Sequence, residues 1–478
     1  MTSNIVKFVY KNKILEIKNP DTNETILNYV RTKLKKTGTK EGCAEGGCGA
    51  CTVVIGELEK NNIKYKAINS CIAFVPSLEG KQLILVEDLI FKNELHPVQK
   101  AMVNYHGSQC GFCTPGFVMS LFAMYKNFSS YKDEIIKDSI QGNLCRCTGY
   151  RPIVEAAKSL NKDGKRDFFA KDKKKTLKLL KKIKNRSIKI INDNKKYFAP
   201  KFINELNKIL RSEPNSKLIS GGTDVSLIVT KERKDLNSLI YLNSIDELNY
   251  IKENNRFIEV GASTPLIKFE SFIKKYFPDF SEVLKRYGSV QIRNVCTIAG
   301  NIATASPIGD TLPMLLVLDS QIIVKGKNKT QILPINGFFT NYRKTKLKKG
   351  QFIHSIRIPF LKQNIFKAYK ISKRIDDDIS SVCASFNIEI NKDKIKKIRI
   401  AYGGMSSTPK RAFNCEKELV NSNLSYKTIS KAKKLLEKDF KPITDTRASQ
   451  NYRMEVAKNL LEKCFSEVKQ KKNIRING

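Results

Sequence analysis

Four cysteines near the start of the chain have a spacing that suits iron–sulfur chemistry. Cys43, Cys48 and Cys51 lie in EGCAEGGCGACTVVIG, and Cys71 follows in AINSCIAFVPSLEG. A C-x4-C-x2-C run followed by a distant cysteine is the plant-type 2Fe-2S ferredoxin pattern. The alternative, a structural zinc site, usually pairs its cysteines as two short arms, which this single loop fits poorly. We therefore predict that these four thiols bind a 2Fe-2S cluster.

Small residues lie between the first three cysteines. Gly46, Gly47 and Gly49 leave the loop without side chains, so backbone N–H groups can approach cluster sulfides and donate hydrogen bonds to them. We expect a bulky side chain at any of these three positions to block the loop from wrapping a cluster.

A second group of four cysteines follows. Cys110 and Cys113 lie in GSQCGFCTPGFVMSLFAMYKN, and Cys145 and Cys147 lie in IQGNLCRCTGYRPIVEAAK. The pattern C-x2-C then C-x-C suits zinc and 2Fe-2S equally, so the spacing leaves both open.

Histidines near the second group are less promising as ligands. Four thiols already satisfy a metal, so we interpret His96 and His106 as residues at helix ends.

The stretches around the cysteines predict two small domains. NIVKFVY and KILEI read as a hairpin around Lys11 and Asn12, NETILNYVRTKLKKTG reads as a helix stopped by Gly38, and CTVVIGEL and KQLILVEDL read as strands. This predicts a β-grasp ferredoxin-like domain over residues 1–88. Short helices opened by Pro97, Pro115 and Pro152 predict a helical bundle over residues 89–160.

Composition limits the class of protein. The 478 residues predict roughly three domains, and 41% hydrophobic residues are enough for packed cores. Eight of the 12 cysteines come before residue 150, which in a cytosolic protein indicates metal binding. No apolar run approaches the roughly 18 residues of a membrane span, and the N-terminal stretch does not read as a signal peptide. We expect a soluble, cytoplasmic protein.

The charge balance is strongly basic. The chain has 87 basic and 46 acidic residues, a formal net charge of +41. Such an excess suits a nucleic-acid binder, but no helix-turn-helix or aromatic RNA-binding pattern accompanies the lysines, which occur in every segment. The expectation is a surface enriched in lysine, with one dense run that reads as a linker over residues 161–185 and contains a possible helix in TLKLLKKIKNR.

The two cysteine groups, in this order, resemble those of the molybdenum hydroxylases, the xanthine dehydrogenase and aldehyde oxidase family. EGCAEGGCGACTV, QCGFCTPGFVMS and GNLCRCTGYRPI are similar to that family's motifs almost word for word. The resemblance implies that the second group binds 2Fe-2S, next to a molybdopterin that the residue matching Gln109 contacts.

Two glycine-containing segments follow the linker. SKLISGGTDVSLIV has a glycine turn between apolar stretches, which alone is weak support for a phosphate site and is not a Rossmann fingerprint. VQIRNVCTIAGNIATASPIGDTLP is a denser run of small and polar residues. In the resembled family both segments bind FAD, the first around the pyrophosphate. The implied FAD-binding residues are Lys217, Leu218, Ile219, Ser220, Gly221, Gly222, Thr223, Asp224, Tyr287, Thr297, Gly300, Asn301, Thr304, Asp310, Ile353 and Lys370.

One of these positions, Tyr287, departs from the family, and two further residues, Asp377 and Tyr342, concern the nicotinamide side of the flavin. Tyr287 stands where the family usually has a Phe against the flavin ring, which keeps the stacking area but adds a hydroxyl that needs a partner. Asp377 matches an acidic residue beside the ring in NAD-dependent members, so we predict it as a catalytic residue, and Tyr342 falls near the nicotinamide site. Without the resemblance, Asp377 would be read as part of a solvated turn. Cys296, Cys383, Cys415 and Cys464 have no metal spacing, and we expect buried thiols.

The resemblance implies a multidomain α+β chain. After the β-grasp domain, the helical 2Fe-2S bundle and the linker, it places an FAD-binding α+β domain of the PCMH, vanillyl-alcohol-oxidase-like type over 186–362. A C-terminal α+β domain like that of the CO dehydrogenase flavoprotein follows over 363–478.

The function that the resemblance implies is electron transfer. Electrons would pass from a molybdenum centre through two 2Fe-2S clusters to FAD and then to NAD⁺, in the separate iron–sulfur and FAD subunit of a bacterial member that oxidises hypoxanthine and xanthine. The partner would be a large molybdopterin-carrying subunit, in a heterotetramer of two small and two large chains. The alternatives are a subunit for an aldehyde or N-heterocycle, a stand-alone iron–sulfur flavoprotein, and a nucleic-acid binder with redox clusters.

Overall fold

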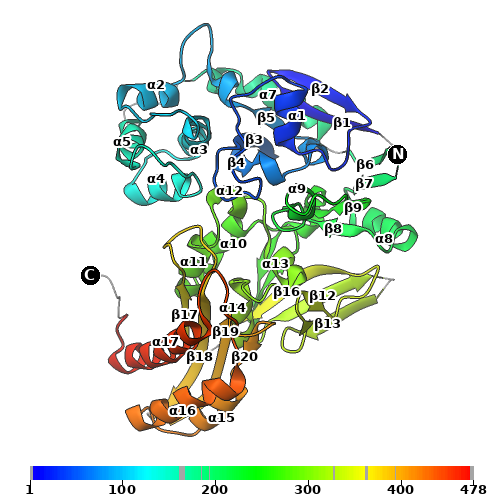
Figure 1. The fold of residues 1–478 in the computed structure, drawn as a ribbon. Helices are drawn as coiled ribbons and strands as arrows, with labels where there is room; N and C mark the ends of the chain where they lie inside the picture. Colours follow the sequence, from blue (N-terminus) through cyan, green and yellow to red (C-terminus); the bar gives the residue numbers. More distant parts are fainter. Residues whose placement is uncertain are drawn as a thin grey trace. The chain divides into compact units, whose positions relative to one another are not determined.

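The computed structural model describes residues 4–160, 167–184, 186–192, 194–326, 329–360, 364–392 and 394–473 (Figure 1). The chain forms two compact units. The first comprises Met1–Glu247 with Gly288–Cys296, and the second comprises Leu248–Tyr287 with Thr297–Gly478. The expected FAD-binding domain, 186–362, is therefore divided between the two units.

A five-stranded sheet with one helix begins the first unit. Its order is β2-β1-β5-β3-β4, with β1 parallel to β5 and the other pairs antiparallel, which is the predicted β-grasp arrangement. Lys11 and Asn12 both have positive φ, as a two-residue hairpin turn requires. The elements are β1 (Ile5–Tyr10), β2 (Lys13–Lys18), α1 (Ile26–Thr32), β3 (Thr52–Glu59), β4 (Asn62–Asn69) and β5 (Gln82–Ile84).

Helix α1 is shorter than the sequence predicts. It ends at Thr32, not near Gly38. The Arg31 guanidinium donates to the carbonyls of Thr37 and Thr39, at 3.0 and 2.8 Å, and so folds the following segment back over the last helical turn. This contact ends the helix before the glycine is reached.

Four helices form the second part of the first unit, as predicted. Helix α3 supplies most of their core, because its side chains from Gly116 to Tyr125 are all buried. The helices are α2 (Pro97–Asn104), α3 (Thr114–Asn127), α4 (Asp133–Ile140) and α5 (Arg151–Ser159).

Part of the expected linker is helical and packed. Residues 161–166 and 185 of that stretch lie outside the described residues, but α6 (Phe168–Lys171) and α7 (Lys173–Ile183) are formed. Leu180 and Ile183 of α7 are buried in the same core as the helical bundle. Because they bury apolar surface, these residues stabilise the unit and do not merely connect its neighbours.

A second sheet and short helices complete the first unit. Its order is β6-β7-β9-β8, and β8 runs parallel to β9. The described part of the first unit also contains the 3-10 turns η1 (Ser70–Ile72), η2 (Val75–Leu78), η3 (Val86–Leu89) and η5 (Leu242–Ser244). The other elements are β6 (Ile188–Asn192), β7 (Lys195–Ala199), α8 (Ile203–Ser212), β8 (Lys217–Ile219), α9 (Leu227–Thr230), β9 (Ser238–Tyr241) and α12 (Val290–Arg293).

The second unit begins with a five-stranded sheet of order β10-β11-β16-β12-β13. A small hairpin, β14 (Phe339–Asn341) with β15 (Lys344–Thr345), stands apart from it. Its other elements are β10 (Ile251–Glu253), β11 (Phe257–Gly261), α10 (Leu266–Ile273), α11 (Pro278–Lys285), α13 (Ile298–Thr304), α14 (Thr311–Val317), β12 (Gln321–Gly326), β13 (Lys329–Pro334) and β16 (Phe352–Pro359).

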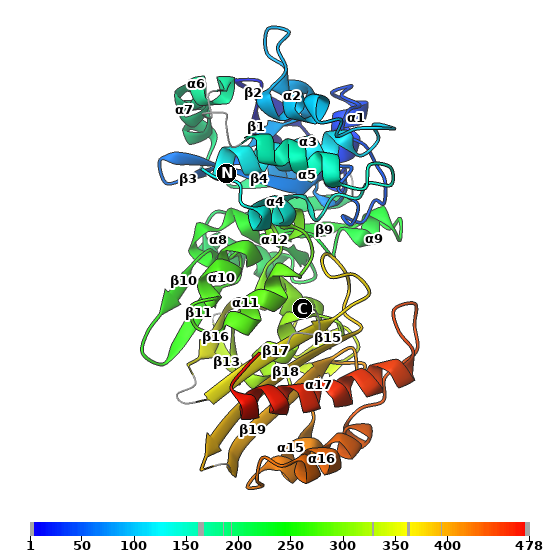
Figure 2. The same ribbon diagram turned by 90° about the vertical axis from the view of Figure 1, so that its left-hand side faces the viewer.

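A four-stranded antiparallel sheet ends the second unit, in the order β17-β18-β19-β20. Figure 2 shows α17 lying across β17, β18 and β19, with α15 and α16 nearby. The elements are β17 (Asn364–Ile371), β18 (Val382–Asn391), β19 (Lys394–Gly403), β20 (Lys410–Arg411), α15 (Phe413–Leu419), α16 (Tyr426–Asp439) and α17 (Gln450–Gln470).

Two expectations about single residues are confirmed. Cys296, Cys383, Cys415 and Cys464 are all buried. Among the described residues, no helix has both the length and the apolar composition that crossing a membrane requires.

A buried ionic group attaches α6 to the helical bundle. His96 caps α2, because its Nδ1 accepts from the backbone N–H of Val98, and its Nε2 lies 3.1 Å from Asp167. Lys126 Nζ donates to both carboxylate oxygens of Asp167 at 2.8 Å. Burial alone would raise the pKa of Asp167, but the His96 and Lys126 contacts outweigh it and lower the pKa.

We expect Asp167→Asn to destabilise the chain by about 1–3 kcal/mol at pH 7, because it leaves buried donors without their acceptor. A lowered folded-state pKa means that the stabilisation is complete above the unfolded value of about 3.9 and is lost as pH falls through the lower folded value. The difference from wild type should therefore shrink in acid. Thermal unfolding between pH 3 and pH 7 measures it. Asp133→Asn, at an exposed ion pair, is the control and should change stability by less than about 0.5 kcal/mol.

Candidate functional site

The structure brings the first four cysteines together. Cys43, Cys48 and Cys51 lie on the loop before β3, and Cys71 lies on the turn η1. Cys51 Sγ and Cys71 Sγ are 3.3 Å apart, and both residues are buried. Hydrogen bonds from the Cys48 and Cys71 thiols lower the pKa of Cys43, and the same contacts raise the pKa of Cys48 and of Cys71. The three side chains are thus in hydrogen-bond contact.

The backbone of the same loop faces sulfur. The N–H groups of Glu45 and Gly47 donate to Cys43 Sγ at 3.5 and 3.3 Å. This is the arrangement expected of a loop that approaches a cluster closely.

The three glycines of the loop differ in what they permit. Gly46 and Gly49 have positive φ, and a Cβ at Gly49 would lie 2.2 Å from the carbonyl oxygen of Gly142. A Cβ at Gly47 would meet no atom of the chain within 4 Å. Packing within the chain therefore favours glycine at Gly46 and Gly49. At Gly47 the chain itself sets no such limit, so the expected steric block there would have to come from a bound cluster.

The second four cysteines also converge, nearer the surface. Cys113 caps the start of α3 and contacts Cys145, while Cys147 contacts Cys110. Burial, with the nearby Cys145, raises the pKa of Cys113 to about 12. Cys110 and Cys147 are exposed, in contrast to the buried Cys51 and Cys71.

Hydroxyl groups order the loop that carries Cys145. Its backbone N–H donates to Tyr150 Oη at 3.0 Å, and Tyr150 itself has a positive φ. Thr148 donates its backbone N–H to Cys145 Sγ at 3.4 Å, and its hydroxyl lies 3.1 Å from the same sulfur. Cys145 thus receives hydrogen bonds of the kind that tune an iron–sulfur cluster.

Both groups fit a 2Fe-2S cluster by their chemistry. Each consists of four thiols with N–H or O–H donors at a sulfur, and soft thiolates bind iron–sulfur clusters or zinc. Within the described ranges, no set of three or more His, Cys, Asp or Glu side chains is arranged to hold a single metal ion. His96 and His106 are at the two ends of α2, which confirms that they are helix-end residues.

Gln109, predicted to contact a molybdopterin, lies immediately before Cys110. Its side chain is exposed. Phe112 and Leu144, next to ligand cysteines of the same group, are 47% and 43% exposed. The surface around the second group, which we define as Gln109, Cys110, Phe112, Leu144 and Cys147, is therefore open and partly apolar.

A buried hydrogen-bond network joins the two thiol-bearing loops. Leu144 N–H donates to the Cys48 carbonyl at 3.0 Å, and Asn143 Nδ2 donates to the Gly49 carbonyl at 3.1 Å. Gly116 of α3 packs so closely that a Cβ there would lie 2.3 Å from the Gly49 oxygen. We call the set Gly49, Thr52, Ser120, Asn143 and Gln291 the loop junction.

The flavin candidates of the first unit surround the turn after β8. Lys217, Leu218 and Ile219 form β8. Ser220 to Asp224 follow it, with Gly222 in a positive-φ conformation and Gly221 beside the backbone of Val295, whose oxygen would lie 2.2 Å from an added Cβ. In this structure, the group that comes close to Gly221 is thus the chain's own backbone.

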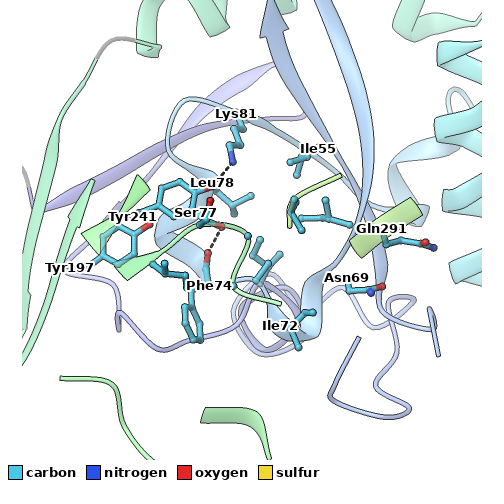
Figure 3. Close-up of a pocket in the computed structure, with 18 residues that line it drawn as sticks. Ile55, Asn69, Ile72, Phe74, Ser77, Leu78, Lys81, Tyr197, Tyr241 and Gln291 are labelled. Carbon is cyan, nitrogen blue, oxygen red and sulfur yellow. Dashed lines mark hydrogen bonds between the residues drawn. The ribbon is translucent and has the colours of Figure 1, made fainter. Parts of the chain in front are cut away.

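Next to this turn is a small cavity of about 40 Å³ (Figure 3). Gly221 and Gly222 line it together with Lys81, Tyr197 and Tyr241. Lys81 Nζ donates to Tyr241 Oη at 3.2 Å, and the buried Tyr197 hydroxyl has no partner among the described residues. A space of this size suits a few water molecules and is too small for a dinucleotide.

The flavin candidates of the second unit form two connected pairs. Asn301 Nδ2 donates to Tyr287 Oη at 3.1 Å, which supplies the partner that this extra hydroxyl needs. Lys370 Nζ lies 2.8 Å from Asp310, and Ser380 Oγ donates to the other oxygen of Asp310 at 2.6 Å. Lys370 and Asp310 are both buried, so each has a role within the chain even without a ligand.

The remaining candidates of the second unit are more scattered. Thr297 caps α13 by accepting from Gly300 N–H at 3.0 Å, and Thr304 is the last residue of that helix. A Cβ at Gly300 would approach only Thr297 Oγ1, at 3.2 Å, among atoms within 4 Å. Ile353 is buried in β16, and Tyr342, 57% exposed, lies at the turn between β14 and β15.

The loop that carries Asp377 is fastened by Arg286, a residue that sequence reasoning missed. The guanidinium donates to Ile375 O at 2.7 Å, to Lys370 O at 2.8 Å and to Ser372 Oγ at 3.3 Å. Asp377 is half-buried and has a φ of 48°. The only signal in the sequence for Arg286 is its position next to Tyr287.

The flavin candidates of each unit are residues of types that can bind part of an FAD. The first offers a glycine turn with the buried Ser226 hydroxyl, which is without a partner among the described residues. The second offers an aromatic ring with polar neighbours. FAD would use the turn for its phosphates and the ring for stacking.

We expect Gly49→Ala to lower the iron content of both cysteine groups, because the new Cβ meets the Gly142 backbone and the αL conformation costs about 1–2 kcal/mol. Iron per chain and the thermal midpoint measure this. Gly47→Ala is the matched control and should keep its iron. An equal loss of iron in Gly47→Ala would mean that the cluster itself, and not packing within the loop, requires these glycines.

We expect Lys370→Met to destabilise the second unit by about 3–5 kcal/mol, because it leaves the buried Asp310 carboxylate unpaired. Circular dichroism should record a midpoint lower by about 10 °C. The double variant Lys370→Met/Asp310→Asn removes both charges and should recover part of the loss. A double variant no more stable than the single one would contradict the role of the charge pair.

Four family profiles match successive parts of the chain. They are described as "2Fe-2S iron-sulfur cluster binding domain" over 9–76, "[2Fe-2S] binding domain" over 85–158, "FAD binding domain in molybdopterin dehydrogenase" over 190–361 and "CO dehydrogenase flavoprotein C-terminal domain" over 367–468.

Curated relatives match across most of the chain. The xanthine dehydrogenase of Blastobotrys adeninivorans is 33% identical over 81% of this chain and 35% of its own length. That of Emericella nidulans is 32% identical over 88% of this chain and 35% of its own length. The xanthine dehydrogenase/oxidase of Rattus norvegicus is 32% identical over 84% of this chain and 34% of its own length. The chain thus spans about a third of the length of these relatives.

Solved structures share the fold. A Cu,Mo-CO dehydrogenase chain aligns with a TM-score of 0.52 and 23% identity, covering 55% of this chain and 94% of that one. A quinoline 2-oxidoreductase chain from Pseudomonas putida 86 aligns with a TM-score of 0.54 and 20% identity, covering 58% of this chain and 98% of that one. Together with the four profiles in their order, these matches show that the chain belongs to the molybdenum hydroxylase family and carries its iron–sulfur and FAD-binding domains.

Proposed function

We propose that this chain is the electron-transfer part of a xanthine dehydrogenase, carrying electrons from a molybdenum centre on a partner chain to NAD⁺. The observation that carries the proposal is the pair of four-thiol groups whose loops are bonded directly to each other, through Leu144 N–H and the Cys48 carbonyl. The relatives that match over more than four-fifths of the chain are named xanthine dehydrogenases, which supports the substrate class.

Different residues of the chain would bind the different cofactors. Cys43, Cys48, Cys51 and Cys71 would hold one 2Fe-2S cluster, and Cys110, Cys113, Cys145 and Cys147 the other. When bound, the clusters supply one-electron transfer and FAD supplies the exchange between single electrons and a hydride. The chain's own contribution is to bind and orient these groups and to keep the first group dry, since Cys51 and Cys71 are buried.

The surface around the second group suits the partner. It is exposed, partly apolar and next to two ligand cysteines, as a surface that receives electrons from another chain must be. We propose that Gln109 contacts the partner's molybdopterin there, in an assembly of two copies of each chain.

The NAD⁺ step would take place at the flavin residues of the second unit. Tyr287 would stack on the flavin ring, and Asp377 would favour a positively charged nicotinamide electrostatically. The half-buried position of Asp377 on a loop fastened by Arg286 supports a fixed place for its carboxylate.

Substrate choice would lie with the partner. A partner that selects an aldehyde or an N-heterocycle would give the same chain a different overall reaction, which is the alternative that we retain.

The experiment is turnover by the purified chain, alone and with its molybdopterin-carrying partner. Alone and loaded with FAD, it should oxidise NADH with a dye acceptor and should not oxidise xanthine; the partner should add xanthine-dependent NAD⁺ reduction. Asp377→Ala should slow NAD⁺ reduction by about ten-fold or more relative to a one-electron dye, since about 1.4 kcal/mol of lost attraction is ten-fold in rate. Asp376→Ala, at the exposed neighbouring residue, is the control.

Two outcomes would contradict the proposal. Xanthine turnover by the chain free of molybdenum would place the substrate site here. Absence of NADH oxidation by an FAD-loaded chain would remove the NAD⁺ role.

A further inference from the structure

Gln291 is a fully buried glutamine at the centre of the loop junction. Its Nε2 lies 3.3 Å from Thr52 Oγ1, 3.0 Å from Ser120 Oγ and 3.1 Å from Asn143 Oδ1. Thr52 directly follows the ligand Cys51, and Asn143 is two residues before the ligand Cys145. One amide therefore reaches the loops of both thiol groups and the helix α3 between them.

The two hydroxyl hydrogens of the junction are both used within it, and Gln291 Oε1 is its buried acceptor without a partner among the described residues. Thr52 Oγ1 donates to the Gly49 carbonyl at 2.6 Å, and Ser120 Oγ donates to Asn143 Oδ1 at 2.6 Å. Both hydroxyl hydrogens are thus used, which leaves the oxygens to accept from Gln291. A buried network with its hydrogens assigned in this way favours one arrangement of the loops over others.

The segment that carries Gln291 is anchored within the first unit. The buried Arg293 donates to Gly288 O at 2.8 Å and pairs with Asp138 of α4, and Asn294 Nδ2 donates to the Ala67 carbonyl of β4 at 2.9 Å. Gly142 adds a close contact, since a Cβ there would lie 2.5 Å from Gln291 Oε1. Gln291 is therefore held by contacts of its own segment with Gly288, α4 and β4, in addition to its bonds to the two loops that it joins.

This placement is unexpected from the sequence. Gly288–Cys296 belongs to the first unit, while the chain on both sides of it belongs to the second. The flanking residues Tyr287 and Thr297 are flavin candidates, yet Gln291 contacts the iron–sulfur loops.

We propose that Gln291 is a positioning residue that holds the two thiol-bearing loops at one separation and so sets the spacing of the clusters that they bind. The proposal rests on the assignment of two 2Fe-2S clusters made above. Removing the amide leaves the acceptors of Thr52, Ser120 and Asn143 without this shared donor, so the loops can take up more than one separation.

The test compares Gln291→Met with wild type by electron paramagnetic resonance of the fully reduced protein. Two reduced clusters interact magnetically, and the interaction falls steeply with distance, so a single spacing gives one resolved splitting. Methionine keeps the length of the side chain and removes its donors. We expect iron content equal to wild type, with the splitting lost or broadened and a shifted reduction potential for at least one cluster.

Two further variants complete the design. Ser120→Ala removes one acceptor and should change the splitting in the same direction but less. Gln99→Met is the matched control, because Gln99 accepts from His96 N–H and donates to Val86 O in the same unit but is not a member of the loop junction. It should leave the splitting unchanged.

The possible failures are distinct. If wild type lacks two reduced cluster signals, the proposed function fails. If wild type shows both, and Gln291→Met keeps its iron with an unchanged splitting, the positioning role is overturned. Loss of iron in both Gln291→Met and Ser120→Ala would also overturn it, since Gln291 would then be needed to build the sites rather than to space them.

Discussion

The backbone carbonyl of Gly49 is the point on which the iron–sulfur part of the structure depends. It accepts from Thr52 Oγ1 at 2.6 Å and from Asn143 Nδ2 at 3.1 Å, and the bare Cα of Gly116 packs against it. Gly49 lies between the ligands Cys48 and Cys51, so these contacts fix a cluster-binding loop from outside. The carbonyl also accepts from Thr52 N–H at 3.0 Å, so it stays paired within its own loop. The Asn143 amide is the buried group that connects it to the segment before Cys145, and this amide would lose an acceptor if the two separated.

The two cysteine groups differ in exposure. In the first group Cys51 and Cys71 are buried and Cys43 and Cys48 are partly exposed, whereas in the second Cys110 and Cys147 are exposed and Cys113 and Cys145 are partly exposed. The N–H to sulfur contacts at Cys43 lie on the exposed part of the first loop, so only the Cys51 and Cys71 side of that group is shielded from water.

Local patterns predicted much of this structure, and contacts between distant residues account for what they missed. The β-grasp sheet, the hairpin at Lys11 and Asn12 and the four buried lone thiols follow from alternation, turn chemistry and spacing, which short stretches carry. The early end of α1 depends on Arg31 reaching the carbonyls beyond the helix. The possible helix in the expected linker is formed, but its packing was missed, because it depends on apolar positions buried in the core of the helical bundle among many lysines.

The candidate sites show the same division. The eight cysteines that we predict as cluster ligands could be selected from the sequence by their spacing, and the structure places thiols of each set in contact with one another. Gln291 and Arg286 were not readable, because each acts through partners more than 80 residues away, such as Asn143 for Gln291 and Lys370 for Arg286. Gly221 shows the converse. The sequence assigns this glycine to a phosphate site, but its close packing against the backbone of Val295 is enough to explain why a glycine stands there.

The loop junction of the first unit and the flavin candidates of the second satisfy their buried polar groups with different chemistry, and the difference suits what each would bind. The loop junction is built from amides and hydroxyls, none of which titrates, so its hydrogen bonds persist over a wide range of pH. The second unit instead buries the Lys370–Asp310 ion pair, with Ser380 and the Arg286 carbonyl completing its hydrogen bonds. A neutral junction adds no charge beside thiolate-bound clusters, whose potentials respond to nearby charge and hydrogen bonds. Under the proposed function, a flavin that takes up single electrons and passes a hydride to NAD⁺ would change its charge and protonation, and a paired lysine and carboxylate can provide a fixed polar environment for it.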